Sequence, residues 1–151
     1  MARIFFEDIV VGSAFESSRR TVTEADIAAF AGVSGDFDKL HTDDVFIRES
    51  TPFRGRIAHG LLVFAIQSGL RAEVSDWQTI GYLGCDRRFR APVYPGDTVA
   101  ARYIVSDARS SSSRTDSGVV TLSVDVFNVE SDELVQSGTD VFLVLKREAA
   151  G

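Results

Sequence analysis

The sequence predicts an α+β fold in which one long helix is wrapped by an antiparallel sheet of about five strands. An apolar segment over residues 60–74 carries apolar side chains on nearly every side, which is typical of a helix enclosed by protein. Four segments with strand character follow it, and a sheet encloses such a helix only by curling round it. The chain has 151 residues, 44% of them hydrophobic. That is enough for one domain with a substantial core, so residues 1–151 are assigned to a single domain.

The elements expected before the enclosed helix are an N-terminal strand, a short helix and a loop. The short helix should begin after Thr23, which forms a capping-box pattern with Asp26 three residues on. Its apolar side chains are Ile27, Phe30 and Ala31. The segment SGDFDKLHTD, residues 34–43, has the periodicity of neither a helix nor a strand, so a loop is predicted there.

Four strands are predicted after the enclosed helix, over residues 79–93, 98–108, 118–131 and 133–147. Alternation is clearest in the third of them and is typical of a sheet covered on one side. One face carries Val120, Leu122, Val124 and Val126, and the other carries Thr121, Ser123, Asp125 and Phe127. The polar segment over residues 106–118 is predicted to be a hairpin loop.

Composition argues against several kinds of partner. The formal net charge is -6, which disfavours nucleic acid and anionic membranes. Glu7 and Asp8 interrupt the first apolar run too early for a signal peptide, and the run over residues 61–66 is far shorter than the ~20 residues of a membrane span. With a single cysteine there is no internal disulfide. A cytoplasmic location is therefore expected. Two histidines far apart, with no carboxylate at ligand spacing, predict no metal.

Three motifs stand out along the chain: GDFDKLH, RIAHGLL followed by SGL, and FRAPVYPGD. Together with the order of elements, they resemble the MaoC-like family of hot-dog-fold enoyl-CoA hydratases and dehydratases over nearly the whole chain. The resemblance implies a hot-dog fold, catalytic roles for Asp36 and His41, and a supporting serine, Ser68, near the catalytic aspartate. It also implies an acyl-CoA thioester as substrate with no further cofactor, R stereochemistry at C3, and homodimers whose sheets meet edge to edge.

Two residues depart from the family pattern. Asp38 stands where the family usually has asparagine, and Lys39 stands where it has proline. An ionised aspartate only accepts hydrogen bonds, so any bond donated by the amide would be lost. Loss of the proline frees the backbone of the loop, while the Lys39 charge is expected to offset part of the added negative charge.

The two catalytic candidates suit a reaction that moves protons through water. An imidazole and a carboxylate that reach the same water can hold it and exchange protons with it near neutral pH. Hydration of a 2-enoyl thioester needs such a water at C3 and a donor for the enolate oxygen. The amide of Gly60, at the start of the enclosed helix, is the expected donor, because it has no helical partner and lies at the positive end of the helix dipole.

The remaining candidates have supporting roles. His59 is interpreted as a structural residue that caps or orients the helix entrance. Ser68 either orients Asp36 or bonds back to its own helix. An acidic protein that binds coenzyme A needs a local basic surface, for which Arg87, Arg88 and Arg90 are the candidates, with Arg54 and Arg56 as weaker ones; a solvated strand face is the alternative.

The predicted function is reversible hydration of a trans-2-enoyl thioester, carried by CoA or by an acyl carrier protein. Two alternatives remain open at this stage. A hot-dog thioesterase would direct the water to the carbonyl carbon in place of C3. A non-catalytic acyl-thioester binding module is conceivable because of Asp38 and Lys39.

Overall fold

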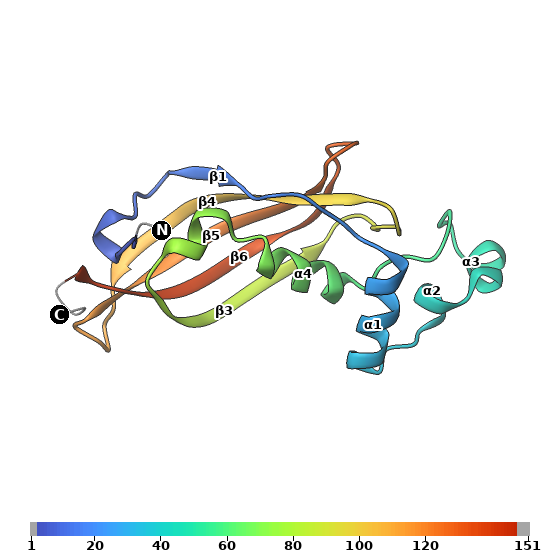
Figure 1. Cartoon of the computed structure of the whole chain (residues 1–151), viewed down its shortest axis with the longest axis horizontal. Helices are drawn as coiled ribbons and strands as arrows, with labels where there is room; N and C mark the ends of the chain where they lie inside the picture. Colours follow the sequence, from blue (N-terminus) through green and yellow to red (C-terminus); the bar gives the residue numbers. More distant parts are fainter. Residues whose placement is uncertain (1–2, 148–151) are drawn as a thin grey trace.

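The computed structural model describes residues 3–147 and confirms the predicted α+β fold, with one helix packed against a six-stranded antiparallel sheet (Figure 1). The helices are α1 (Glu24–Ser34), α2 (Lys39–Thr42), α3 (Asp44–Ser50) and α4 (Gly60–Gly69), with 3₁₀ turns η1 (Phe6–Asp8) and η2 (Ala72–Asp76). The strands are β1 (Ala14–Glu16), β2 (Arg20–Thr21), β3 (Thr79–Phe89), β4 (Thr98–Ser110), β5 (Ser117–Asn128) and β6 (Leu134–Leu145).

The sheet has the order β1-β4-β5-β6-β3, and β2 also pairs with β4. The order of the four predicted strands along the chain suggests an antiparallel meander, and β4, β5 and β6 do form one. Strand β3, however, pairs with β6 and not with β4, so the four long strands are not one continuous meander. The connection after β3 therefore crosses the sheet, and β3 becomes an edge strand. The predicted hairpin loop is shorter than expected, because β4 and β5 extend into it and leave only residues 111–116 outside the strands.

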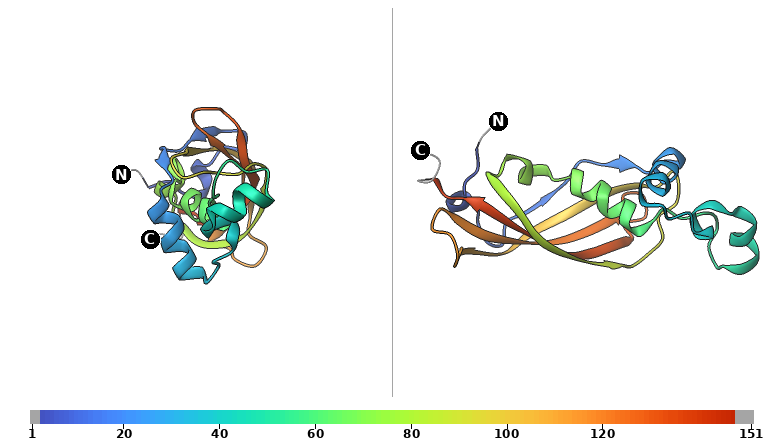
Figure 2. Two further views of the ribbon diagram at one scale, coloured as in Figure 1. Left: turned by 90° about the vertical axis from the view of Figure 1, so that its right-hand side faces the viewer. Right: turned by 90° about the horizontal axis from the view of Figure 1, so that it is seen from below.

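Helix α4 lies in the concave face of the sheet, which curls around it as the hot-dog resemblance implies (Figure 2). Leu62, Val63 and Ile66 are buried and belong to the same core cluster as the inward side chains of the strands. Each such burial stabilises the fold by about 1.5–3 kcal/mol. The helix is not enclosed on every side, however, because Leu61 is 60% exposed and Ala65 is also exposed.

Helix α4 is also shorter than the predicted residues 60–74. Its last turn is tightened by a bond from the Leu70 amide to the Gln67 carbonyl oxygen, at 2.9 Å. Ala72 then has a φ of +46°, which a continuing α-helix does not allow. Gly69, a poor helix former, precedes this break. The apolar pattern therefore continues beyond Gly69 into the separate 3₁₀ turn η2.

Helix α1 begins as its sequence predicts. The Thr23 hydroxyl oxygen accepts from the Asp26 amide at 3.1 Å, and the Asp26 carboxylate accepts from the Thr23 amide at 2.9 Å. The bond from the Thr23 amide is the largest cause of a lowered pKa for Asp26, because it stabilises the carboxylate form. Ile27 and Ala31 are buried, as expected. Helices α1, α2 and α3 gather at one end of the molecule, and α2 and α3 project beyond the sheet (Figure 1).

The alternation in β5 is confirmed on its inward face, where Val120, Leu122, Val124 and Val126 are all at most 1% exposed. Phe127 was expected on the solvent side but is only 5% exposed. The pairing register between β5 and β6 shifts between Val126 and Phe127, which breaks the two-residue period. The Arg102 guanidinium then covers the Phe127 ring at 3.7 Å.

A polar cluster lies between α4 and the sheet, away from the end that carries α2 and α3. The side chains of Arg87 in β3 and Asp140 in β6 are each only 5% exposed and form an ion pair at 2.6 Å. Gln67 of α4 accepts from Arg87 at 2.9 Å, and the Tyr82 hydroxyl donates to Asp140 at 2.7 Å. This cluster links the edge strand to the central helix. Among residues 3–147 no helix is long and apolar enough to cross a membrane.

Candidate active site

The segment that follows α1 is shaped by short-range hydrogen bonds. Gly35 ends α1 with a φ of +76°, a left-handed conformation that glycine adopts without strain. Asp36 comes next, and its Oδ1 accepts from the Asp38 amide at 3.2 Å. Asp38 in turn caps α2, because its carboxylate accepts from the Leu40 amide at 2.9 Å. The predicted loop therefore contains the one-turn helix α2, which carries His41.

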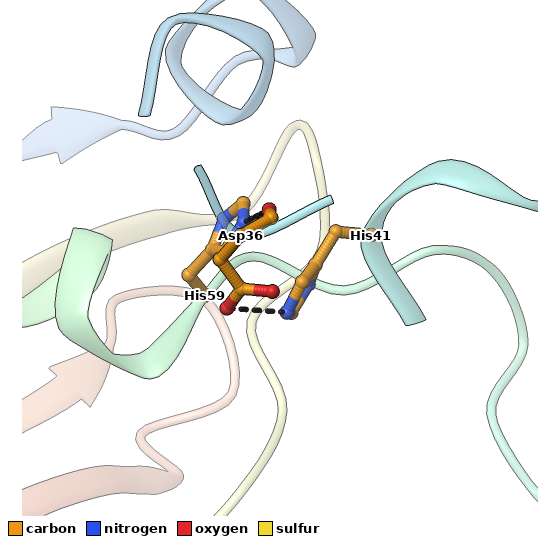
Figure 3. A group of neighbouring side chains, drawn as sticks. All are labelled: Asp36, His41 and His59. Carbon is orange, nitrogen blue, oxygen red and sulfur yellow. Dashed lines mark hydrogen bonds and ion pairs between the residues drawn. The ribbon is translucent and has the colours of Figure 1, made fainter. Parts of the chain in front are cut away.

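The ring of His41 is held by a hydrogen bond to a backbone carbonyl group. Its Nδ1 lies 2.7 Å from the Ile57 carbonyl oxygen, which can only accept, so Nδ1 carries the proton and Nε2 is bare in the neutral ring. Nε2 faces Asp36 Oδ2 at 3.9 Å (Figure 3). That distance is too long for a direct hydrogen bond but suits one bridging water. The His41 side chain is 9% exposed and that of Asp36 is 52% exposed, so the pair lies at the boundary between core and solvent.

His59 lies against both members of this pair. Its ring stacks on that of His41 with 3.7 Å between centroids, and the ring of Phe30 in α1 lies 5.0 Å from the His59 ring, centroid to centroid. Its Nε2 donates to the Asp36 carbonyl oxygen at 2.9 Å. His59 is the N-cap residue of α4, yet its side chain makes no cap bond. Of the two structural roles expected for His59, its side chain does not cap the helix but holds the Asp36 segment against the helix entrance.

The two histidines are far apart in sequence but adjacent in space, so the sequence argument against a metal does not hold. Donor atoms of Asp36, His41 and His59 lie within 4.8 Å of one another. One nitrogen of each ring is, however, already bonded to a carbonyl oxygen. A metal ion bound by both histidines would need a lone pair from each ring to point at the same place. The two rings are stacked with 26° between their planes, so their free lone pairs point side by side and do not converge. The cluster suits proton transfer better than metal binding.

The Asp36–His41 pair opens onto a cavity of about 700 Å³ at the N-terminus of α4. Gly60 lines the same cavity, and within residues 3–147 its amide N–H has no hydrogen-bond acceptor. Most of the wall is apolar, with only a few polar groups, as is usual for a site that takes a largely apolar ligand. The apolar wall is formed by Phe30, Leu40, Phe53, Ile57, Ala58, Leu61, Val63, Phe89, Ala91, Pro92 and Val93.

Comparison with known proteins agrees with this geometry. The family model described as "MaoC like domain" matches residues 8–128. This chain belongs to the MaoC-like family. It is 34% identical to an (R)-specific enoyl-CoA hydratase of Aeromonas caviae, over 80% of this chain and 85% of that protein. It is 39% identical to Protein MaoC of Klebsiella aerogenes over 66% of this chain, but that match spans only 30% of the Klebsiella protein.

Solved structures show the same fold. A monoamine oxidase regulatory protein of Archaeoglobus fulgidus superposes with a TM-score of 0.87 at 38% identity, covering 97% of both chains. A Mycobacterium tuberculosis protein with a double hotdog fold has a TM-score of 0.81 at 22% identity, covering 95% of this chain and 44% of that one, which shows the fold alone. The hot-dog fold predicted from the sequence is therefore confirmed.

The structure accounts for the two departures of this MaoC-like chain from its family pattern. Asp38 needs only to accept a hydrogen bond from the Leu40 amide, so aspartate serves the cap as well as asparagine would. Lys39 lies 5.4 Å from the ring of Phe46 in α3. Neither change places a new side-chain contact on the Asp36 carboxylate or on the His41 ring among the hydrogen bonds and ion pairs of residues 3–147.

Two expected contacts of the MaoC-like site are not made. Ser68 does not approach Asp36, because it lies near the far end of α4 and its hydroxyl donates to the Ala65 carbonyl oxygen at 2.7 Å, which was the alternative interpretation. Arg87 was a candidate for the coenzyme A surface, but its guanidinium is buried in the pair with Asp140. Arg87 faces α4 because side chains alternate along β3, which leaves its neighbour Arg88 on the outside.

The other candidate arginines differ in how accessible their guanidinium groups are to a phosphate. Arg88 is exposed, and Arg90 lines the cavity while its Nε donates to Ser137 at 3.1 Å. Arg54 is 70% exposed, forms one ion pair with Asp97 at 3.4 Å and stacks on Tyr94. Arg56 is already paired with Glu24 and Asp44, so it is the poorest candidate.

One polar residue of the cavity was missed from the sequence. Gln136 of β6 lines the cavity, is 2% exposed, and donates to the Gly60 carbonyl oxygen at 2.7 Å. A signal for it was present, because Gln136 and Asp140 lie in phase with the apolar Phe142 and Val144 along β6. A polar residue on the inward face of a strand is expected to have a buried partner.

Proposed function

We propose that this protein catalyses the reversible addition of water to a trans-2-enoyl thioester. The observation that supports this most directly is the bare Nε2 of His41, 3.9 Å from Asp36 Oδ2, beside a cavity that also contains the unpartnered amide of Gly60. Two relatives are named (R)-specific enoyl-CoA hydratase, which supports the same proposal. Hydration needs a held water and a donor for the developing enolate, and these three groups supply both functions.

In the proposed mechanism, Asp36 Oδ2 and His41 Nε2 each accept a hydrogen bond from one water. As the water oxygen bonds to C3, one O–H bond breaks and the proton passes to Nε2. The negative charge moves to the thioester oxygen, where the Gly60 N–H donates to it. The enolate then takes a proton at C2 from the Asp36–His41 pair, which restores the neutral imidazole. The bond from His41 Nδ1 to Ile57 steadies the ring while it is charged.

The acyl chain of the substrate would lie against the apolar wall of the cavity, and its carrier would extend toward solvent. Arg88 and Arg90 are proposed to contact the phosphates of coenzyme A or of an acyl carrier's phosphopantetheine. Within residues 3–147, Arg88 makes no side-chain hydrogen bond and Arg90 donates only through its Nε to Ser137, whereas the Arg87 guanidinium is engaged by Asp140. R stereochemistry at C3 is proposed on family resemblance alone.

A panel of trans-2-enoyl-CoA substrates of increasing chain length tests this function. Hydration removes the conjugated-enoyl absorbance without releasing thiol, so the expected result is loss of that absorbance with no reaction of a thiol reagent. Saturated butyryl-CoA serves as the matched control, because it has no double bond to hydrate. Thiol release from either substrate would indicate a thioesterase, and binding without turnover on every chain length would indicate a binding module.

A homodimer formed through β3 is also proposed. This edge strand exposes Ile80, Tyr82, Leu83 and Phe89, each more than 40% accessible. A long apolar edge invites pairing with another strand, and a second copy of the chain would supply one. A cytoplasmic location is likewise a proposal.

Sedimentation velocity tests the dimer. The expected mass is twice the 16.5 kDa of one chain. Leu83→Lys should shift the protein toward monomer, because a charge on the edge strand opposes pairing. Ile104→Lys is the matched control, since Ile104 is similarly exposed but lies in β4, whose backbone is paired on both sides. A monomeric wild-type protein, or equal effects of the two substitutions, would contradict this proposal.

A further inference from the structure

Gln136 occupies an unusual place for an amide side chain. It lies at an inward position of β6, directly opposite Phe89 of β3 in the strand register. Only 2% of the residue is exposed. Its Nε2 donates to the Gly60 carbonyl oxygen at 2.7 Å, and its Oε1 has no hydrogen-bond partner within the described residues. Because the Gly60 oxygen can only accept, the amide group facing it must be the NH₂.

Stability alone does not explain this arrangement. A buried acceptor without a partner carries a desolvation penalty, which offsets the net gain expected from the single hydrogen bond that Gln136 makes. An apolar side chain of similar size would fill the same space without that cost. The distinctive contribution of Gln136 is thus the contact it makes with Gly60.

Gly60 is a residue whose backbone needs restraint. Glycine has the widest conformational freedom of any residue, and Gly60 lies in the first turn of α4, where its own amide has no helical acceptor. Gln136 holds its carbonyl group. On another side lies the Phe89 ring, so close that a Cβ on Gly60 would fall 2.7 Å from two ring carbons. The peptide group that carries the Gly60 N–H is held at its carbonyl end, where the His59 oxygen accepts from the Val63 amide at 3.2 Å.

We propose that Gln136 is a positioning residue that, together with Phe89, fixes the direction of the Gly60 N–H toward the thioester oxygen. This inference rests on the proposed hydratase function. Phe89 and Gln136 are paired in the strand register, and both contact the start of α4, which ties it to the sheet. The direction of the Gly60 N–H is therefore fixed before substrate binds. A preorganised donor stabilises the transition state more than the substrate. Loss of Gln136 should therefore lower kcat more than it raises KM.

Gln136→Met is the first test variant, because it keeps the length of the side chain and removes the donor. The expected result is a fall in kcat of roughly 10- to 100-fold, part of the loss seen when an oxyanion donor is deleted outright. Gln78→Met, on a half-buried glutamine near η2 whose side chain lies outside the cavity, is the matched control and should leave kcat unchanged. Circular dichroism and a thermal melt confirm that both variants fold. A folded Gln136→Met with wild-type kcat would overturn the inference.

Gln136→Glu distinguishes positioning from packing. A protonated carboxyl group can donate to the Gly60 oxygen, whereas an ionised one would repel it. The kcat of this variant, divided by that of Gln136→Met at the same pH, should therefore rise as the pH falls through the titration of the introduced carboxyl group. A ratio that stays constant with pH, while the fold is retained, would count against a hydrogen-bonding role.

The bound carbonyl itself provides a readout that does not need turnover. Butyryl-CoA labelled with ¹³C at the thioester carbonyl cannot be hydrated, and infrared difference spectra report the hydrogen bond to its oxygen. Wild type should shift the carbonyl band to lower frequency, and Gln136→Met should shift it less. No shift in wild type would refute the Gly60 donor of the proposed function. An equal shift in wild type and Gln136→Met would refute only the role of Gln136.

Discussion

Asp36→Asn and His41→Asn should each lower kcat for enoyl-CoA hydration by about 100- to 10,000-fold, the usual contribution of general acid–base catalysis. Both substitutions are chosen to preserve local structure. Asparagine at position 36 keeps an oxygen for the Asp38 amide, and asparagine at position 41 keeps an N–H close to where Nδ1 donates to the Ile57 oxygen. What is lost is the carboxylate charge in one variant and the bare ring nitrogen in the other.

The measurement is the initial rate of absorbance loss with crotonyl-CoA, with the fold checked by circular dichroism. Asp125→Asn is the matched control, because Asp125 is exposed on the outer face of β5 and should not affect turnover. The double variant should be little slower than either single one, since two groups that act on one water are not additive. A folded variant at either position with wild-type turnover would remove that residue from the mechanism.

Asp140→Asn and Arg87→Met should each destabilise the protein by about 3–5 kcal/mol, because each leaves one buried partner of an ion pair without its counter-charge. Both side chains are 5% exposed and lie 2.6 Å apart. Their other partners would also be disturbed, since Arg87 donates to the Thr139 carbonyl and Asp140 accepts from Tyr82.

Urea denaturation at a fixed protein concentration measures this effect. Asp132→Asn is the matched control, because Asp132 pairs with Arg102 at 2.7 Å on the surface, where water screens the attraction. Its midpoint should stay close to that of wild type. Equal shifts for the buried and the surface pair would show that burial does not set the strength of the Arg87–Asp140 interaction.

The same cluster predicts how stability responds to alkali. Burial first, and then the hydrogen bond to Asp140, raises the pKa of the Tyr82 phenol above its usual value. A group whose pKa is raised by folding contributes stability that is complete below its unfolded-state pKa of about 10. That contribution declines as the pH rises above this value. The hydroxyl therefore continues to donate to Asp140 throughout the neutral range.

Predictions from the sequence succeeded where a local pattern decides the structure. The capping box of Thr23 and Asp26 starts α1 in the expected place, and the alternation over Val120 to Val126 gives the inward face of β5. They failed where non-local contacts decide it. The end of α4 depends on the backbone at Ala72, and the pairing of β3 with β6 depends on strand packing across the sheet. Arg87 looked like a surface cation because its partner Asp140 lies far along the chain, in a different strand.

By itself, the sequence determined where α1 begins and where the long strands lie, because caps and alternation involve neighbours in the chain. The hot-dog fold and the candidates Asp36 and His41 came from the resemblance of its short motifs to the MaoC-like family, and Gly60 from its place at the start of a helix. Only the tertiary structure decided that His59 stacks on His41, that Gln136 holds Gly60, and that Ser68 and Arg87 lie outside the site. The physical reason is that a hydrogen bond or a stacked ring requires atoms within a few ångströms of each other. Sequence spacing does not fix such distances between separate elements, whereas folding does.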